Sequence, residues 1–188
     1  MIRSFIAIDI PDDIKKKIAA VQSELKESSA DVKWVRPGSI HLTMKFLGNI
    51  EEGQIKEIGE KIRESAKAIS PFSIAVTCIG VFPHMRNPRV IWIGLEETEG
   101  KLSALQRGIE ENLQRLGFEK EERGFSPHLT IGRVKSSKGK SRLIEMLERK
   151  KEERFHQSIS VHEVRLMKSD LKPTGPVYTV LETVALSE

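Results

Sequence analysis

The stretch Ser39-Ile-His-Leu-Thr-Met44 returns later in the chain as Ser126-Pro-His-Leu-Thr-Ile131. Both stretches contain His-Leu-Thr followed by an apolar residue. Because residues two apart on a β-strand point to the same face, each stretch predicts a strand that presents a histidine and a threonine together. The leucine and the last apolar residue then face a hydrophobic core. The fold must therefore bury one face of each strand and leave the other face open.

Most of the chain repeats with the same offset as the two histidines, which is 87 residues (128 minus 41). Strands are expected at 3–9, 40–47, 72–82, 89–95, 127–134, 158–167 and 177–186, helices at 12–28, 51–69, 98–116 and 139–154, and turns at 83–88 and 170–175. The pattern indicates a duplicated unit of about 90 residues, which is far longer than a solenoid repeat. We expect two lobes related by a pseudo-two-fold axis. Phe5 and Trp92, which share the offset, are expected to line the groove between the lobes.

The chain has 188 residues, of which 38% are hydrophobic and 31% charged. This balance is typical of a soluble globular protein, and the chain, 1–188, is expected to form one domain of two packed lobes. The single cysteine, Cys78, excludes an internal disulfide and favours a reducing cytoplasm. We expect no signal peptide, because Asp9 and Pro11 interrupt the first apolar run. We also expect no membrane span, because no apolar run approaches about 20 residues.

The formal net charge of the chain is +4 and its pI is about 9.2. A mildly basic chain favours polyanionic partners such as RNA, since Lys and Arg contacts to phosphate supply non-specific affinity. Many proteins of this charge bind no nucleic acid. The charge alone therefore leaves both interpretations open.

Two histidines and two threonines that face one groove suit the cleavage of a phosphodiester. Imidazole titrates at about pH 6.5, so one ring can act as a neutral base while the other acts as a protonated acid. Opening a cyclic phosphodiester needs a water activated on one side of phosphorus and a proton delivered to the leaving oxygen on the other side. Threonine hydroxyls can donate hydrogen bonds to the non-bridging oxygens. His41, His128, Thr43 and Thr130 are therefore the candidate site residues.

The paired motifs resemble those of the 2H phosphoesterase superfamily, in which two His-x-Thr-x motifs stand on equivalent strands of a duplicated α+β unit. Other segments resemble the branch of RNA 2′,3′-cyclic phosphodiesterases, historically called 2′-5′ RNA ligases. These segments are Arg3-Ser-Phe-Ile-Ala-Ile8, the run from His41 to Gly48, Gly80-Val-Phe-Pro83, Val90-Ile-Trp92 and the run from His128 to Arg133. The resemblance covers essentially the whole chain. It implies a two-lobed α+β fold, with antiparallel sheets around a central groove flanked by helices.

The resemblance also implies an activity, which is hydrolysis of the 2′,3′-cyclic phosphate ends of RNA to 2′-phosphomonoesters without a metal or a cofactor. His41 matches the proton donor of the family and His128 its proton acceptor. Thr43 and Thr130 match the phosphate-binding threonines, and Arg133 matches a basic residue that contacts the nucleotide. The implied partners are RNA ends, such as tRNA fragments, or small cyclic nucleotides. The cytoplasmic location is expected from the single cysteine, and a monomer is the default expectation.

Two basic residues of the motif strands are further candidates for nucleotide contacts. Strict alternation places Lys45 on the same face as His41, where it either steers phosphate or is solvated. The same alternation places Arg133 on the opposite face from His128. Arg133 reaches the groove only if the strand bends, which a bulge at Gly132 would allow.

Three other functions stay open at this point. A metal hydrolase is disfavoured, because the chain has no His-x-His or His-Glu-x-x-His spacing. A non-catalytic RNA- or nucleotide-binding module would need neither histidine for chemistry. RNA ligation through a 2′-5′ bond would use the same groups in reverse.

Phe5 and Trp92 either stack on a base or pack in the core.

Overall fold

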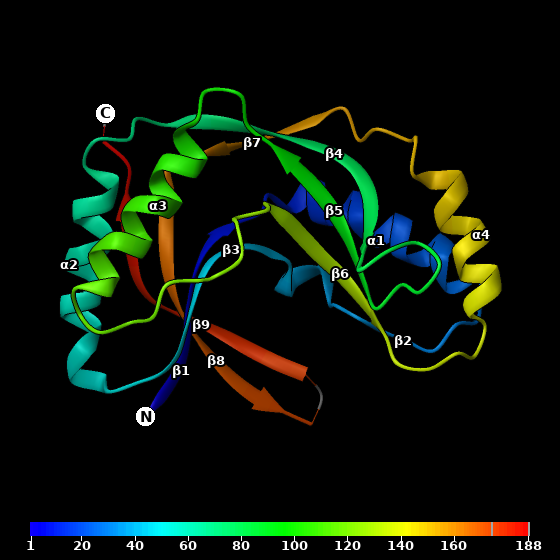
Figure 1. Ribbon diagram of the computed structural model, residues 1–188, viewed down its shortest axis with the longest axis horizontal. Helices are drawn as coiled ribbons and strands as arrows, with labels where there is room; N and C mark the ends of the chain where they lie inside the picture. Colours follow the sequence, from blue (N-terminus) through cyan, green and yellow to red (C-terminus); the bar gives the residue numbers. More distant parts are fainter. Residues whose placement is uncertain (174, 188) are drawn as a thin grey trace.

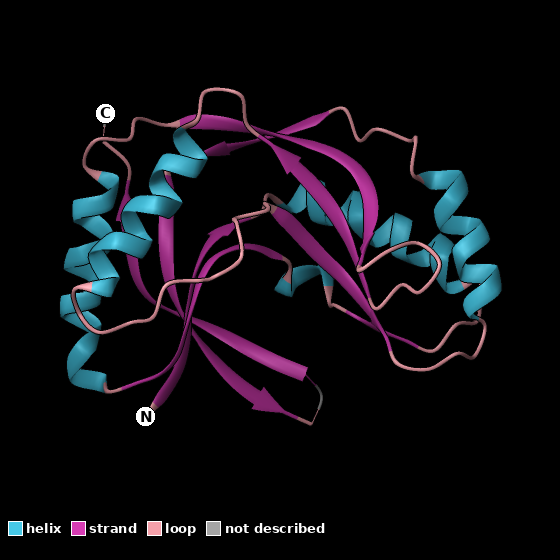
Figure 2. Ribbon diagram, in the orientation of Figure 1, coloured by secondary structure: helices cyan, strands magenta, loops and turns pink. Residues whose placement is uncertain are grey.

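Two antiparallel β-sheets meet at the centre of the molecule, and helices flank them (Figures 1 and 2). The computed structural model describes residues 1–173 and 175–187. The first sheet has the strand order β3-β1-β8-β9, formed by His41–Ile50, Ile2–Asp9, Glu163–Lys172 and Gly175–Ala185. The second sheet has the order β2-β6-β5-β4-β7, formed by Val32–Trp34, His128–Val134, Val90–Glu96, Phe72–Phe82 and Gln157–Val161. The expected α+β architecture is confirmed.

The helices form two pairs, one beside each sheet (Figure 1). They are α1 (Asp12–Lys26), α2 (Ile55–Ala66), α3 (Lys101–Gln114) and α4 (Lys140–Lys150), with short 3-10 helices η1 (Pro37–Ser39) and η2 (Glu52–Gln54). α2 packs against α3 and against β9 of the first sheet. α1 contacts α4, and α4 contacts β4 of the second sheet. No helix in the described ranges is long and apolar enough to cross a membrane.

Each sheet is completed by an inner strand from the other half of the chain. The repeat relates β1 to β5, β3 to β6 and β4 to β8. However, β1 pairs with β8 from the second half, and β5 pairs with β4 from the first half. The helix pairs are mixed in the same way, because α3 joins α2 and α1 joins α4. Neither half can therefore close and cover its own sheet, and the two lobes depend on each other.

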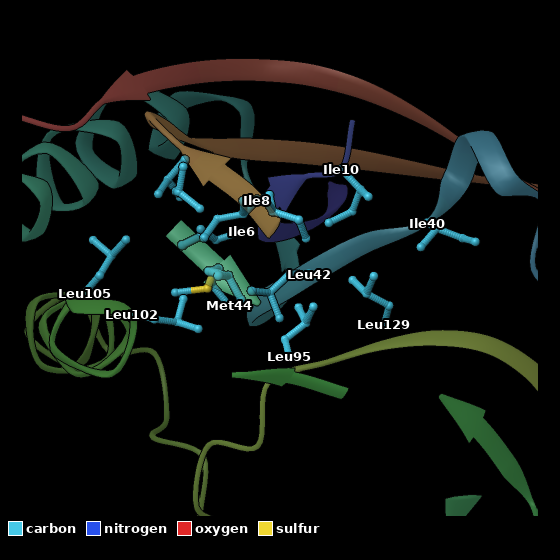
Figure 3. Packing of buried hydrophobic residues seen from close by; sticks show 14 of the residues in the cluster. Ile6, Ile8, Ile10, Ile40, Leu42, Met44, Leu95, Leu102, Leu105 and Leu129 are labelled. Atoms are coloured by element: carbon cyan, nitrogen blue, oxygen red, sulfur yellow. The ribbon is translucent and has the colours of Figure 1, made fainter. Parts of the chain in front are cut away.

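The apolar residues of the two motif strands lie in the core, as their alternation predicts. Leu42 and Met44 of β3 and Leu129 and Ile131 of β6 are each at most 2% exposed. Figure 3 shows this core where α3 packs against β3, with side chains of the second sheet beside it. The opposite face of each strand is left for the histidines and threonines.

A one-residue β-bulge interrupts each motif strand at equivalent positions. In β3 the pairing with β1 skips Met44, and in β6 the pairing with β5 skips Ile131. Each extra residue shifts the alternation of side chains by one position. Beyond the bulges, Phe46 and Arg133 therefore point to the same face as the motif histidines, and both are exposed.

The bulge in β3 corrects the expected place of Lys45. Its side chain lies on the core side of the strand, where the residue is 3% exposed. Its Nζ donates to Glu110 Oε2 of α3 and to the carbonyl oxygen of Glu119, both at 2.6 Å. Lys45 therefore forms a buried ion pair and does not reach a nucleotide in the groove, because the alternation on which that expectation rested does not continue through a bulge.

Gln22 of α1 has the matching role at the bulge in β6. It is 2% exposed, and its Nε2 donates to the carbonyl oxygens of Ile131 at 2.9 Å and Val35 at 2.7 Å. The carbonyl oxygen of Ile131 also accepts a hydrogen bond from the backbone N–H of Val35 at 3.0 Å, so the amide of Gln22 adds a second donor where the bulge interrupts the pairing with β5. In each lobe a buried polar side chain thus ties the bulged strand to a helix from the other half of the chain.

Three segments differ from the sequence expectation. The strand expected at 158–167 is split at His162 into β7 and β8, which lie in different sheets. The short strand β2 is not expected, because three residues carry too little pattern to be recognised. The turn expected at 170–175 is shorter, because β8 and β9 both extend into it, and Thr174 within it lies outside the described residues.

We predict that Lys45→Met and Glu110→Leu each lower the free energy of unfolding by about 3 kcal/mol, because each leaves a buried charge without its partner. Urea denaturation followed by circular dichroism measures the change. The double variant should recover most of the loss, since the two apolar side chains can pack together. Lys61→Met is the control, because its surface ion pair with Glu64 contributes at most about 1 kcal/mol. Losses that simply add in the double variant would contradict a coupled pair.

Candidate active site

The two motif histidines are held in the same way, at the first position of β3 and of β6. His41 Nδ1 donates to the carbonyl oxygen of Ser39 at 2.9 Å, and His128 Nδ1 donates to that of Ser126 at 2.6 Å. A carbonyl oxygen can only accept, so Nδ1 carries a proton in both rings and Nε2 is left for another partner. β3 and β6 are in contact where the lobes meet, and Figure 1 shows them converging at the centre of the molecule.

His41 lies in a cluster of aromatic rings on the first sheet. It stacks on Phe5 of β1 with ring centroids 4.6 Å apart, and it meets the edge of Tyr178 of β9 at 5.2 Å. Burial lowers the pKa of His41, and the hydrogen bond to Ser39 and the charge of Asp9 offset only part of this shift. The neutral imidazole is therefore favoured in the unliganded protein.

His128 lies beside two different rings on the second sheet. Phe82 of β4 meets it edge-on at a centroid distance of 5.2 Å, and Trp92 of β5 lies at 6.3 Å. Trp92 covers Gly80 on the neighbouring strand so closely that a Cβ there would come within 2.2 Å of its ring. Phe5 and Trp92 thus occupy matching places beside the two histidines, as the repeat predicts. Phe5 is only 4% exposed, because His41 and its neighbours cover it.

The motif threonines share the face of the histidines. Thr43 is paired with Ala7 of β1, and Thr130 is paired with Trp92 of β5. Both residues are half-buried. Within residues 1–173 and 175–187 neither hydroxyl has a hydrogen-bond partner, so both can donate to a ligand in the groove.

Arg133 lies on the groove face because of the bulge in β6. The sequence predicts this position for Arg133 only if the strand bends in this way. The bulge turns Gly132 towards Trp34 of β2, where a Cβ would lie 3.0 Å from the indole ring. Burial raises the pKa of the Tyr178 phenol on the first sheet, and the positive charges of Arg3 and Arg133 oppose that shift.

A cavity of about 150 Å³ opens beside His41, lined in part by Lys15, Arg165 and Tyr178. Asp9 at its wall forms ion pairs with Lys15 and Arg165, each at 2.9 Å. Burial alone would raise the pKa of Asp9, but the hydrogen bond from Lys15 and the nearby positive charges lower it overall. The charges around this cavity are therefore balanced. Among the described residues, no three His, Cys, Asp or Glu side chains gather as a metal site requires.

The duplicated architecture matches that of a known protein family. The family model described as LigT like Phosphoesterase matches the chain twice, over residues 8–92 and 93–178. The chain belongs to the LigT-like phosphoesterase family. The double match confirms both the duplication and the resemblance to 2H phosphoesterases.

Relatives of this LigT-like phosphoesterase match it over nearly its whole length. The RNA 2′,3′-cyclic phosphodiesterase of Methanothermobacter thermautotrophicus is 36% identical over 185 residues, which cover 98% of this chain and 99% of the relative. The protein of the same name from Methanocaldococcus jannaschii is 40% identical over 180 residues, which cover 96% and 98%. A crystal structure of a Thermus thermophilus protein has a TM-score of 0.82 at 28% identity and covers 98% of this chain and 97% of that one. E. coli LigT complexed with 3′-AMP has the same fold, with a TM-score of 0.79 at 23% identity, covering 100% and 99%.

Two residues beside the histidines are not found by sequence reasoning. Tyr178 lies far from both motifs in the chain, and only the pairing of β9 with β8 brings it to His41. Phe82 belongs to a segment whose pattern predicts a strand end and a turn, with no sign of a contact to His128.

We predict that His41 titrates below its ordinary value of 6.5, because burial disfavours the imidazolium. NMR spectra of the ring protons from about pH 4 to pH 8 measure the midpoint. In the unfolded chain His41 has its ordinary pKa of about 6.5, which is higher than its pKa in the folded protein. The contribution of His41 to the free energy of unfolding is therefore complete above about pH 6.5, and it is lost as the pH falls through the pKa of the folded protein. His41→Asn should remove this part of the pH dependence. A titration midpoint of His41 at or above the histidine midpoint of the urea-unfolded chain would contradict the prediction.

We predict that Gly80→Ala displaces Trp92 and lowers the free energy of unfolding by about 1–3 kcal/mol, because the new methyl group overlaps the indole ring. Tryptophan fluorescence and urea denaturation measure the two effects. Gly53→Ala is the matched control, since nothing lies within 4 Å of a Cβ at that position. Equal stability of the two variants would show that Trp92 does not depend on this glycine.

Proposed function

We propose that this chain hydrolyses the 2′,3′-cyclic phosphate ends of RNA to 2′-phosphomonoesters. The observation that carries the proposal is the matched geometry of His41 and His128, whose Nδ1 atoms are clamped alike while Nε2 is left for a substrate. Membership of the LigT-like phosphoesterase family supports the same activity, as do the relatives named RNA 2′,3′-cyclic phosphodiesterase.

His128 acts as the proton acceptor and His41 as the proton donor, in accord with the family resemblance. The Nε2 atom of neutral His128 takes a proton from a water molecule that attacks phosphorus. The bond from phosphorus to the 3′-oxygen breaks on the opposite side, and Nε2 of protonated His41 delivers a proton to that oxygen. The product carries a 2′-phosphate and a free 3′-hydroxyl.

Thr43 and Thr130 bind the phosphate from the two sides of the groove. Their hydroxyls donate hydrogen bonds to the non-bridging oxygens, and these bonds strengthen as negative charge develops in the transition state. Arg133 contacts the nucleotide from the second sheet.

The protonation of His41 is coupled to substrate binding. Burial lowers the pKa of His41 in the unliganded protein, so a proton donor at this position needs a nearby anion. The negative charge of the cyclic phosphate supplies it, since an opposite charge within hydrogen-bond distance favours the imidazolium. Substrate binding is then accompanied by proton uptake at His41.

Several finer features belong to the same proposal. The acid–base pair works without a metal or cofactor, and the substrates are RNA ends such as tRNA fragments, or small cyclic nucleotides. The chain acts as a cytoplasmic monomer, and 1–188 form one domain because each sheet takes an inner strand from the other half. The same groups can join a cyclic phosphate to a 5′-hydroxyl through a 2′-5′ bond, but in water hydrolysis dominates.

The test is incubation of the purified protein, in EDTA, with an oligoribonucleotide that ends in a 2′,3′-cyclic phosphate, followed by mapping of the product end. We expect a 2′-phosphate product, and at least about a 100-fold loss of turnover in both His41→Ala and His128→Ala. His162→Ala is the control, because this exposed histidine lies between β7 and β8.

Two outcomes would contradict the proposal. Activity that EDTA abolishes would favour a metal hydrolase. RNA binding without any turnover, unaffected by both motif substitutions, would indicate a binding module.

A further inference from the structure

Lys33 of β2 lies beside Arg133 of β6 on the groove face of the second sheet. The two residues are directly paired in antiparallel register, so their side chains point to the same face. Arg133 is also paired with Val90, which lies two residues from Trp92 on β5. Lys33, Arg133 and Val90 therefore lie on the same face of the second sheet as Trp92 and His128. Both basic side chains are exposed.

This pair of like charges has no counter-ion among the described residues. Neither Lys33 nor Arg133 forms an ion pair with any residue in 1–173 or 175–187. Like charges directly opposite each other on neighbouring strands destabilise a sheet. A bound anion between them would remove this repulsion, and Lys and Arg are the usual phosphate ligands of proteins.

The cations that line the cavity beside His41 are neutralised. Lys15 and Arg165 both bond to Asp9, and Arg165 also bonds to Glu163. A further anion near His41 would therefore meet carboxylates as well as cations. Arg3 of the first sheet also forms no ion pair among the described residues, but its partner on β3 is the uncharged Asn49. Two directly paired cations without counter-ions therefore lie on the side of Arg133.

The distance along β6 separates this pair from the reacting phosphate. Thr130 and Arg133 are paired with Trp92 and Val90, which are two residues apart on β5, so they lie roughly 7 Å apart along the sheet at the ordinary rise of a strand. An anion between Lys33 and Arg133 is therefore a different group from the one that Thr130 binds. In an RNA chain the nearest such group is the phosphodiester on the 5′ side of the terminal nucleotide. A cyclic mononucleotide has no phosphate there.

We propose that Lys33 and Arg133 together bind the phosphodiester on the 5′ side of the terminal nucleotide. The inference rests on the proposed function and names its substrate class, which is RNA chains in preference to cyclic mononucleotides. The ammonium and guanidinium groups bind the phosphodiester oxygens from neighbouring strands. The RNA then leaves the groove across the second sheet.

The test compares kcat/KM for a cyclic mononucleotide with kcat/KM for an oligoribonucleotide that ends in the same cyclic nucleotide. The unmodified protein should prefer the oligonucleotide. Lys33→Ala should lower this preference about tenfold, the size of one charge-assisted hydrogen bond. Lys33→Arg should keep most of it. Lys56→Ala is the control, because Lys56 is an exposed lysine on α2, which lies beside the other sheet.

A second arm replaces the 5′-side phosphodiester of the oligonucleotide by an uncharged methylphosphonate. The unmodified protein should then lose the preference, and Lys33→Ala should add no further loss. A preference that the methylphosphonate leaves intact, or that Lys33→Ala leaves unchanged, would overturn the inference.

Binding separates a failure of this inference from a failure of the proposed function. An oligoribonucleotide with a 3′-phosphate end is not a cyclic substrate, and fluorescence anisotropy measures its affinity without turnover. Lys33→Ala should weaken this binding about tenfold relative to Lys56→Ala. If the two variants bind equally while cyclic ends are still hydrolysed, the proposed function stands and the inference fails.

Discussion

Each sheet needs an inner strand that only the other half of the chain can supply. β8 lies between β1 and β9, and β4 lies between β5 and β7, so the loss of either strand would divide a sheet. This exchange joins the two halves into one fold and sets β3 against β6 where the lobes meet. The groove follows from that arrangement, because each motif lies at the start of its strand and turns its polar face away from the core.

Duplication supplies two alike rings, whereas acid–base catalysis needs two different protonation states. The backbone treats both histidines alike, since each Nδ1 donates to the carbonyl oxygen two residues before it. Their surroundings differ. Burial among aromatic rings lowers the pKa of His41, whereas His128 lies beside Phe82 and Trp92. The charges differ as well: Asp9 forms ion pairs with the cations beside His41, whereas Arg133 forms none with any described residue. On this symmetric scaffold the neighbours give the groove a direction, which a polynucleotide with distinct ends requires.

Sequence reasoning succeeds here where a pattern has a period. Alternation identifies the face that carries His41 and Thr43, and the fixed offset pairs this face with the second motif. Alternation fails at Lys45, because a bulge adds one residue without a change in composition and nothing local marks it. In β6, Gly132 indicates that a bulge could occur, so the sequence predicts that Arg133 reaches the groove if such a bulge forms. The strand exchange and the position of Tyr178 depend on which distant strands pair, and a local pattern carries no information about that choice.

The pH dependence of kcat/KM for hydrolysis of an RNA cyclic end tests the acid–base pair most directly. If one histidine must be neutral and the other protonated, the profile is bell-shaped. Replacing either His41 or His128 by glutamine, which is polar but does not titrate, should slow the reaction and remove one limb of the bell while the other remains. A bell that keeps both limbs in either variant, or a profile of the unmodified protein that is flat from about pH 5 to pH 8, would contradict the account.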